Sequence, residues 1–152
     1  IDKLSEYACV IGMDASPYDN MPLVVQKSQI YTNFAITYFF GTQGLKVIPN
    51  VRIGNDDTIG MLDAMPRGCL IAVGTNGFTW RRDNREIFRK QMKIVTDVLR
   101  PSGVLVYGQA YEYVFQSTIE AGIPVYQYDS HTIKRNAEVK SGRPLEGANY
   151  ER

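Results

Sequence analysis

The residue types that most often carry catalytic or metal chemistry are scarce in this chain. Its 152 residues include one histidine, two cysteines and one tryptophan. The lone histidine, His131, argues against a histidine-based triad and against a site with several histidine ligands. Cys9 and Cys69 lie inside apolar runs and lack the close spacing of a metal site, so we expect two buried thiols. The sequence therefore indicates no metal and no particular catalytic residue or cofactor.

Excess charge is also missing. Seventeen basic and sixteen acidic residues leave a formal net charge of +1, so attraction to nucleic acid or to a membrane would need a local patch. No long apolar run is free of polar residues. The most apolar stretch, residues 23–40, contains Gln26, Lys27, Gln29 and Asn33, which favours a buried helix over a membrane span. We expect a soluble, cytoplasmic protein with no membrane partner.

Five apolar segments are the strongest positive signal. They cover residues 7–13, 45–51, 69–74, 103–107 and 124–128, and helical stretches separate them. The runs are continuously apolar rather than alternating, which is typical of parallel strands covered on both faces by helices. We therefore predict an α/β protein with a three-layer, mostly parallel, five-stranded doubly wound sheet of the flavodoxin-like or Rossmann-like type. A partial (β/α) barrel is the alternative.

The longest helix is expected to run from about residue 21 to residue 43. Asp19 or Asn20 is the natural N-cap, Pro22 fits the first turn, and Gly44 supplies a left-handed C-terminal stop. Apolar residues surround most of its circumference, so we expect it to be well buried. Its outward aromatic residues, if any, would favour an oligomer interface.

The remaining helices have weaker boundaries. Asp56 or Asp57 is expected to cap a short helix that reaches about residue 65. A third helix starts after Asp83 or Asn84 and ends before Pro101. A fourth spans about 111–121 and stops at Gly122. Residues 1–135 form one domain in this interpretation, and residues 136–152 form an extended or disordered arm. Because the first strand opens so close to residue 1, a fragment of a longer protein is one interpretation.

Polar side chains follow the strand ends. Ligands of open parallel sheets bind beyond the carboxyl ends of the strands, so these side chains are candidates for a polar small-molecule site. The same residue types also cap helices and make turns. Asp14 and Asp129 are the best candidates, because neither stands directly before its helix. The candidate ligand-binding residues are Asp14, Ser16, Arg52, Asn76, Gln109 and Asp129.

A basic stripe on the third helix offers an alternative function. Cations four residues apart beside a stacking aromatic are typical of single-stranded nucleic acid binding. A solvated helix face carries the same residues, and Glu86 and Asp97 dilute the charge. The candidate nucleic-acid-binding residues are Trp80, Arg81, Arg82, Arg85, Arg89 and Lys93. A third interpretation is a homo-oligomer or structural partner protein that uses residues 136–152 as a docking arm.

Several motifs resemble a known family. They are Met-Pro-Leu at 21–23, Gln-Gly-Leu-Lys-Val-Ile-Pro at 43–49, Pro-Arg-Gly-Cys-Leu-Ile-Ala-Val-Gly-Thr-Asn-Gly at 66–77 and Leu-Arg-Pro-Ser-Gly-Val-Leu-Val-Tyr-Gly at 99–108. Together with Asp14-Ala15-Ser16, their order and spacing resemble the bacterial and phage domain of unknown function numbered forty-four seventeen, from about residue 10 to about residue 128. The resemblance implies a phage or mobile-element setting and no established activity.

Overall fold

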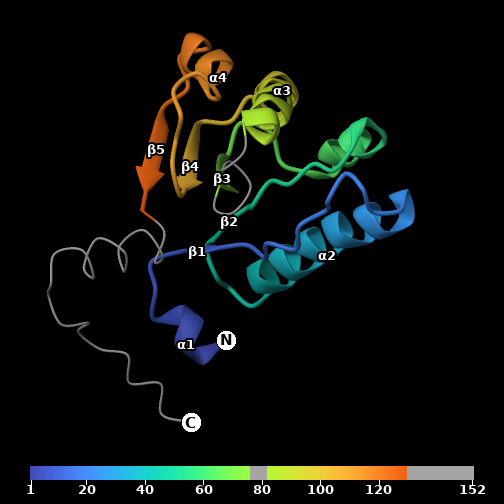
Figure 1. Ribbon diagram of the computed structural model, residues 1–152. Helices are drawn as coiled ribbons and strands as arrows, with labels where there is room; N and C mark the ends of the chain where they lie inside the picture. Colours follow the sequence, from blue (N-terminus) through green and yellow to red (C-terminus); the bar gives the residue numbers. More distant parts are fainter. Residues whose placement is uncertain (76–81, 130–152) are drawn as a thin grey trace, which may run out of the picture.

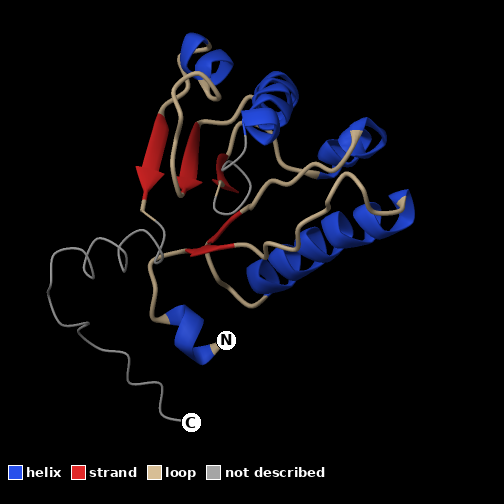
Figure 2. Cartoon of the chain, viewed as in Figure 1, coloured by secondary structure: helices blue, strands red, loops and turns tan. Residues whose placement is uncertain are grey.

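A computed structural model describes residues 1–75 and 82–129 of the chain (Figure 1). The predictions made for Asn76, Trp80, Arg81 and His131, and for the arm at 136–152, lie outside the described residues. Strands and helices alternate along the rest of the chain (Figure 2). The α/β class is confirmed.

The strands form two small parallel sheets. In the first, β1 (Val10–Ile11) pairs with β2 (Val47–Ile48). In the second, the order is β3 (Leu70–Gly74), β4 (Gly103–Tyr107) and β5 (Val125–Tyr128). All five strands fall inside the predicted segments. One doubly wound sheet of five strands is not confirmed, and the described strands do not close into a barrel.

An isolated parallel bridge between Asn50 and Ala72 connects the two sheets. The Val51 amide donates to the Ala72 carbonyl at 2.8 Å, and the Ala72 amide donates to the Pro49 carbonyl at 2.8 Å. Pro49 has no amide hydrogen, which shortens the ladder that β2 can form. The segment just after β2 therefore lies beside β3, and its pairing is too brief to extend the three-stranded sheet.

The main core lies between the three-stranded sheet and α3 (Arg82–Leu99). The sheet contributes Ile71 and Val73 from β3 and Val104 and Val106 from β4. The helix contributes apolar residues at helical spacing, with Phe88, Met92, Val95 and Leu99 all buried. The short helix α4 (Gln116–Glu120) packs beside α3, where Thr96 and Thr118 share a buried hydrogen bond of 2.8 Å.

The other face of the three-stranded sheet is bare at β5 and at the end of β4 among the described residues, whereas Ala72 of β3 is buried there. Register pairs Tyr107 with Tyr128 and Leu105 with Tyr126, so these side chains share the face opposite α3. Tyr107, Tyr126 and Tyr128 are all exposed. The prediction of coverage on both faces is therefore wrong for β5. Consecutive strands joined by crossovers of the same hand place their helices on the same face.

The helix α2 (Leu23–Thr42) has the predicted limits. Pro22 stands at its N-cap, although neither Asp19 nor Asn20 caps it through a side chain. Gly44 has φ of +82°, and the Leu45 amide donates to the Phe40 carbonyl at 3.2 Å, which is the predicted glycine stop. None of the helices in the described ranges combines the length and the apolar character needed to cross a bilayer.

The predicted burial of α2 is wrong. Only Gln26, Ile30 and Asn33 are buried, while Val24, Tyr31 and Tyr38 are strongly exposed. Among the described elements, the helix contacts mainly β2 and the 3₁₀ helix η1 (Asp56–Ala64). An apolar composition with no clear amphipathic period gave no signal for which side would be buried.

Three smaller boundaries also differ from prediction. A short helix, α1 (Asp2–Ser5), precedes the first strand. Asn55, rather than Asp56 or Asp57, is the N-cap residue of η1. The predicted fourth helix is reduced to α4, which is preceded by turns, although Gly122 ends it with φ of +73° as expected.

The two thiols differ in accessibility, which corrects the prediction that both are buried. Cys9 is exposed and Cys69 is partly buried, and burial raises the pKa of the Cys69 thiol. A raised pKa lowers the thiolate fraction near pH 8, and thiolate is the reactive form. We expect two phases in a thiol titration with an aromatic disulfide reagent, with Cys9 reacting about tenfold faster or more. Cys9→Ser should remove the fast phase; loss of the slow phase instead would contradict the assignment.

Candidate functional site

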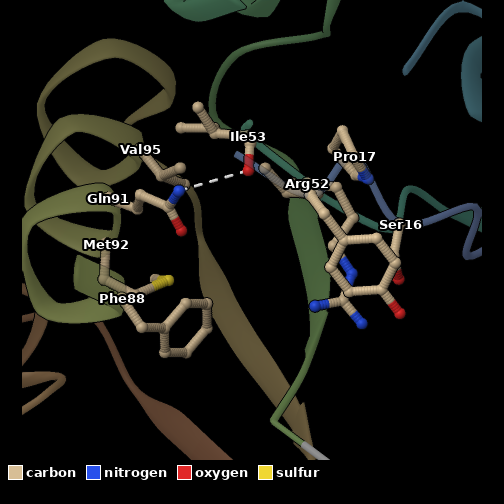
Figure 3. A pocket seen from close by; sticks show the side chains of 10 residues that line it. Ser16, Pro17, Arg52, Ile53, Phe88, Gln91, Met92 and Val95 are labelled. Carbon is tan, nitrogen blue, oxygen red and sulfur yellow. Dashed lines mark hydrogen bonds between the residues drawn. The ribbon is translucent and has the colours of Figure 1, made fainter. Parts of the chain in front are cut away.

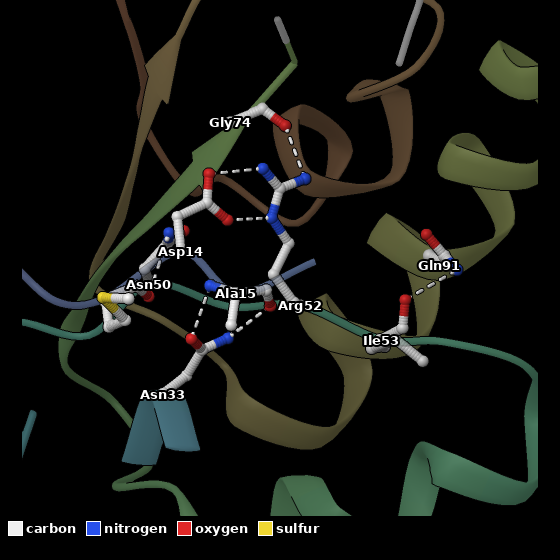
Figure 4. Close-up of polar contacts among 9 residues, drawn as sticks. Asp14, Ala15, Asn33, Asn50, Arg52, Ile53, Gly74 and Gln91 are labelled. Carbon is white, nitrogen blue, oxygen red and sulfur yellow. Dashed lines mark hydrogen bonds and ion pairs between the residues drawn. The ribbon is translucent and has the colours of Figure 1, made fainter. Parts of the chain in front are cut away.

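Arg52 joins three chain segments at the carboxyl ends of the strands (Figure 4). Its Nε donates to Oδ1 of Asp14 at 2.5 Å and its Nη2 to Oδ2 at 2.7 Å, which makes a bidentate ion pair. Its Nη1 donates to the Gly74 carbonyl at 2.9 Å. The Arg52 side chain is only 14% exposed, against 46% for Asp14. The structure thus brings two of the six predicted ligand-binding residues into contact.

Gly74 has no side chain, and the guanidinium group of Arg52 occupies the space that a side chain there would need. A Cβ at this position would lie 2.8 Å from Nη2 of Arg52, which is closer than real Cβ contacts come. The backbone of Gly74 is not in the left-handed region, so the requirement is for space rather than for conformational freedom. The end of β3 is therefore shaped around the guanidinium group.

Two buried amides of α2 hold the loops that surround this ion pair. Asn33 Nδ2 donates to the Ala15 carbonyl at 2.9 Å, and the Ala15 amide donates to Asn33 Oδ1 at 2.7 Å (Figure 4). Gln26 Nε2 donates to the Met21 carbonyl at 2.8 Å, and its Oε1 accepts from the Asn55 amide at 2.8 Å. The sequence interpretation missed both roles. The available signal was their seven-residue spacing, which puts them on the same side of a helix.

A third amide fixes the segment after Arg52. Gln91 Nε2 on α3 donates to the Ile53 carbonyl at 3.2 Å (Figure 3) and to the Gly54 carbonyl at 2.9 Å. Gly54 also has no room for a side chain, because a Cβ there would overlap the Gln26 side chain. Side-chain amides from two helices thus hold the loops after β1 and β2 where backbone ladders have ended.

A cavity of about 170 Å³ lies between these loops and α3 (Figure 3). Polar groups line part of it, from Ser16, Tyr18, Arg52 and Gln91. The remaining lining is apolar and comes from Pro17, Val51, Ile53, Phe88, Met92 and Val95. Few convergent polar groups over an apolar wall are typical of a small-molecule site.

The described contacts do not join the predicted ligand-binding residues Gln109 and Asp129 to this cluster. Gln109 is exposed and its Nε2 donates to Gln127 Oε1 at 3.4 Å. Asp129 is exposed and follows β5, which β4 separates from β3 in the three-stranded sheet. Among residues 1–75 and 82–129, His, Cys, Asp and Glu side chains form no group of three that could hold a metal ion.

The predicted basic stripe on α3 is largely engaged with other side chains. The Arg85 guanidinium lies 4.9 Å from the centre of the Tyr111 ring. Arg89 pairs with Glu86 at 3.0 Å, and Lys93 pairs with Asp97 at 2.8 Å. These pairs are exposed, so salt and solvent weaken them. They nevertheless offset the positive charge that phosphate groups would need.

Replacement of Arg52 by lysine tests its bracing role. A lysine keeps the charge but cannot form the fork on Asp14 and reach the Gly74 carbonyl together. We expect Arg52→Lys to lower the free energy of unfolding by about 1–3 kcal/mol. Arg67→Lys is the matched control, since Arg67 pairs with Asp63 at 3.4 Å on the surface and should change stability by less than about 0.5 kcal/mol. Equal effects in urea unfolding would contradict the bracing role.

Comparison with known proteins places the chain in a family. The domain of unknown function DUF4417 matches residues 1–129, so the chain belongs to that family. The chain is also similar to the Gene 1 protein of Mycobacterium phage L5, with 26% identity over 110 residues. That alignment covers 72% of this chain and 48% of the phage protein, so the chain spans about half the length of this relative. No solved structure matches the chain.

Proposed function

We propose that this member of the DUF4417 family binds a small polar ligand at the carboxyl ends of its first strands. The observation that carries the proposal is the cavity beside Arg52, with polar groups on amide-held loops and an apolar wall from α3. Binding sites of parallel α/β sheets lie at this edge. The similarity to a phage protein supports a phage-related role for the binding.

The lining groups restrict the chemistry of the ligand. A guanidinium has five N–H donors, and the contacts with Asp14 and Gly74 use three of them. Two donors are left, and Arg52 lines the cavity together with Ser16 and Tyr18. Asp14 offsets the charge of Arg52, which favours a ligand of low net charge over a polyphosphate. Since a cavity of about 150 Å³ takes a benzene ring, the apolar body should be about that size.

Nucleic-acid binding through α3 is the alternative, and the geometry supports it less well. Arg85, Arg89 and Lys93 each have a side-chain partner among the described residues. A phosphate backbone would have to replace these partners. We therefore make nucleic acid an outcome of the experiment rather than a second proposal.

Thermal unfolding in the presence of candidate ligands tests the proposal. The panel contains small carboxylates, amino acids, nucleosides, nucleotides, sugar phosphates and short DNA and RNA. A ligand at a hundred times its dissociation constant stabilises the fold by about 2.7 kcal/mol, which raises the melting temperature measurably. We expect a small ligand of low charge to give this shift.

A cavity-filling variant locates the bound ligand. Ser16→Phe should fold with little change in melting temperature and lose the ligand-dependent shift, because the added ring occupies the cavity. Ser102→Phe, at an exposed position between α3 and β4, is the control and should keep the shift. A shift that survives Ser16→Phe, or one seen with oligonucleotides alone, would contradict a site at this cavity.

A further inference from the structure

The outward side of α2 carries a regular row of exposed residues. The row, called the outer stripe, consists of Val24, Ser28, Tyr31, Ala35, Tyr38 and Thr42, and all six are exposed. Their steps of four and three residues keep them within an arc of about 80° on a helix that turns about 100° per residue. The buried residues Gln26 and Asn33 lie on the opposite side of the helix, where they bond to Asn55 and Ala15.

The outer stripe does not have the composition of a solvated helix face. Val24 is 74% exposed, Tyr31 67% and Tyr38 76%. Lys27 is the single charged residue among the twenty residues of α2. A surface helix normally places charged and polar residues on the side away from the core. This helix instead directs Gln26 and Asn33 inward and leaves Val24, Tyr31 and Tyr38 exposed on the outward side, which is typical of a face that a partner covers.

The order of side-chain sizes along the stripe points to what covers it. Larger side chains stand at 24, 31 and 38, and smaller ones at 28, 35 and 42. We propose that the outer stripe is the interface of a homodimer in which two α2 helices pack antiparallel around a twofold axis. In that arrangement Ser28 faces the partner's Tyr38, Ala35 faces the partner's Tyr31, and Thr42 faces the partner's Val24. The layers that contain Tyr31 and Tyr38 then combine a large side chain with a small one, as close packing requires, and the end layers combine two side chains of similar size.

The parallel arrangement fits the same stripe poorly. Parallel helices with heptad spacing place each stripe residue against its own copy. Tyr31 and Tyr38 would then meet the same tyrosines of the partner, and Ala35 would meet the partner's Ala35. Layers of two large side chains would alternate with layers of two small ones, and neither kind would pack well. The two Lys27 side chains would also lie at the same level. Antiparallel packing separates them by about 18 Å along the helix axis, since twelve residues rise 1.5 Å each.

The available area fits a weak, closed dimer. Each tyrosine can bury about 150–250 Å², and both are at least two-thirds exposed. With Val24, the small residues and the flanking Phe39, the helix face supplies roughly 600 Å² per protomer. Two such faces reach the lower limit of about 1,200 Å² for specific interfaces. Because the same patch serves both copies, the association stops at two.

Sedimentation velocity tests the dimer. Protein concentrations from about 5 to 300 μM suit the weak association expected of an interface with a small buried area. We expect the sedimentation coefficient to rise from a monomer value to a dimer value. Ser28→Tyr places a tyrosine against the partner's Tyr38 and should weaken dimerisation at least tenfold. The size swap Ser28→Tyr/Tyr38→Ser restores a large–small layer and should recover the dimer. Since both positions are exposed, the melting temperature of dilute protein should stay within a few degrees of the original.

These variants distinguish the proposed dimer from a monomer, from a dimer with another register and from an interface on the sheet. A protein that stays monomeric throughout the range overturns it, as does a dimer that Ser28→Tyr leaves unchanged. A double variant no better than Ser28→Tyr overturns the antiparallel register. Tyr126→Ser is the control on the bare sheet face, where Tyr126 is 48% exposed. Loss of the dimer in that variant, with retention in Ser28→Tyr, would assign the interface to the sheet instead.

Discussion

This structure depends most on the contacts of the Arg52 guanidinium group. It bonds to Asp14 and to Gly74 and so links three chain segments. Among the described residues, backbone hydrogen bonds join the two sheets around the bridge between Asn50 and Ala72. Arg52 adds a bidentate ion pair with Asp14 and a bond to the Gly74 carbonyl at the same edge. A charged group that is mostly buried must keep its partners, because an unpaired buried charge costs several kcal/mol. Its position is therefore well defined, and so is that of the cavity beside it.

Helix α2 reverses the usual distribution of side chains. A buried amide is tolerated when its hydrogen-bonding groups are satisfied, and Gln26 and Asn33 meet that condition by holding the loops after β1 and β2. The inward side of the helix thus positions the candidate site. Of its apolar side chains, Ile30 is buried, whereas Val24, Tyr31 and Tyr38 face outward. The inward side of α2 thus supports the proposed ligand site, and its outward side supplies the proposed dimer interface.

The parts of the fold predicted from sequence are those that short-range rules decide. Residues 69–74 and 103–107 match β3 and β4 closely, because continuous apolar runs mark buried parallel strands. Pro22 and Gly44 marked both ends of α2. The rule that ligands bind beyond the carboxyl ends of parallel strands also selected Asp14 and Arg52, which are in contact in the structure. Long-range packing decided the rest: which side of α2 is buried, which face of β5 is covered, and which carbonyl each amide meets.

The glycine at position 54 ties two distant positions together. Its backbone is ordinary, yet a Cβ there would overlap the side chain of Gln26. A larger residue at 54 becomes acceptable only when the side chain at 26 becomes shorter, and a shorter side chain at 26 abandons the Asn55 amide. In the evolution of the family the two positions should therefore change as a pair. Glycine is needed at 54 because of the side chain at position 26, twenty-eight residues earlier, and not because of a turn in its own backbone.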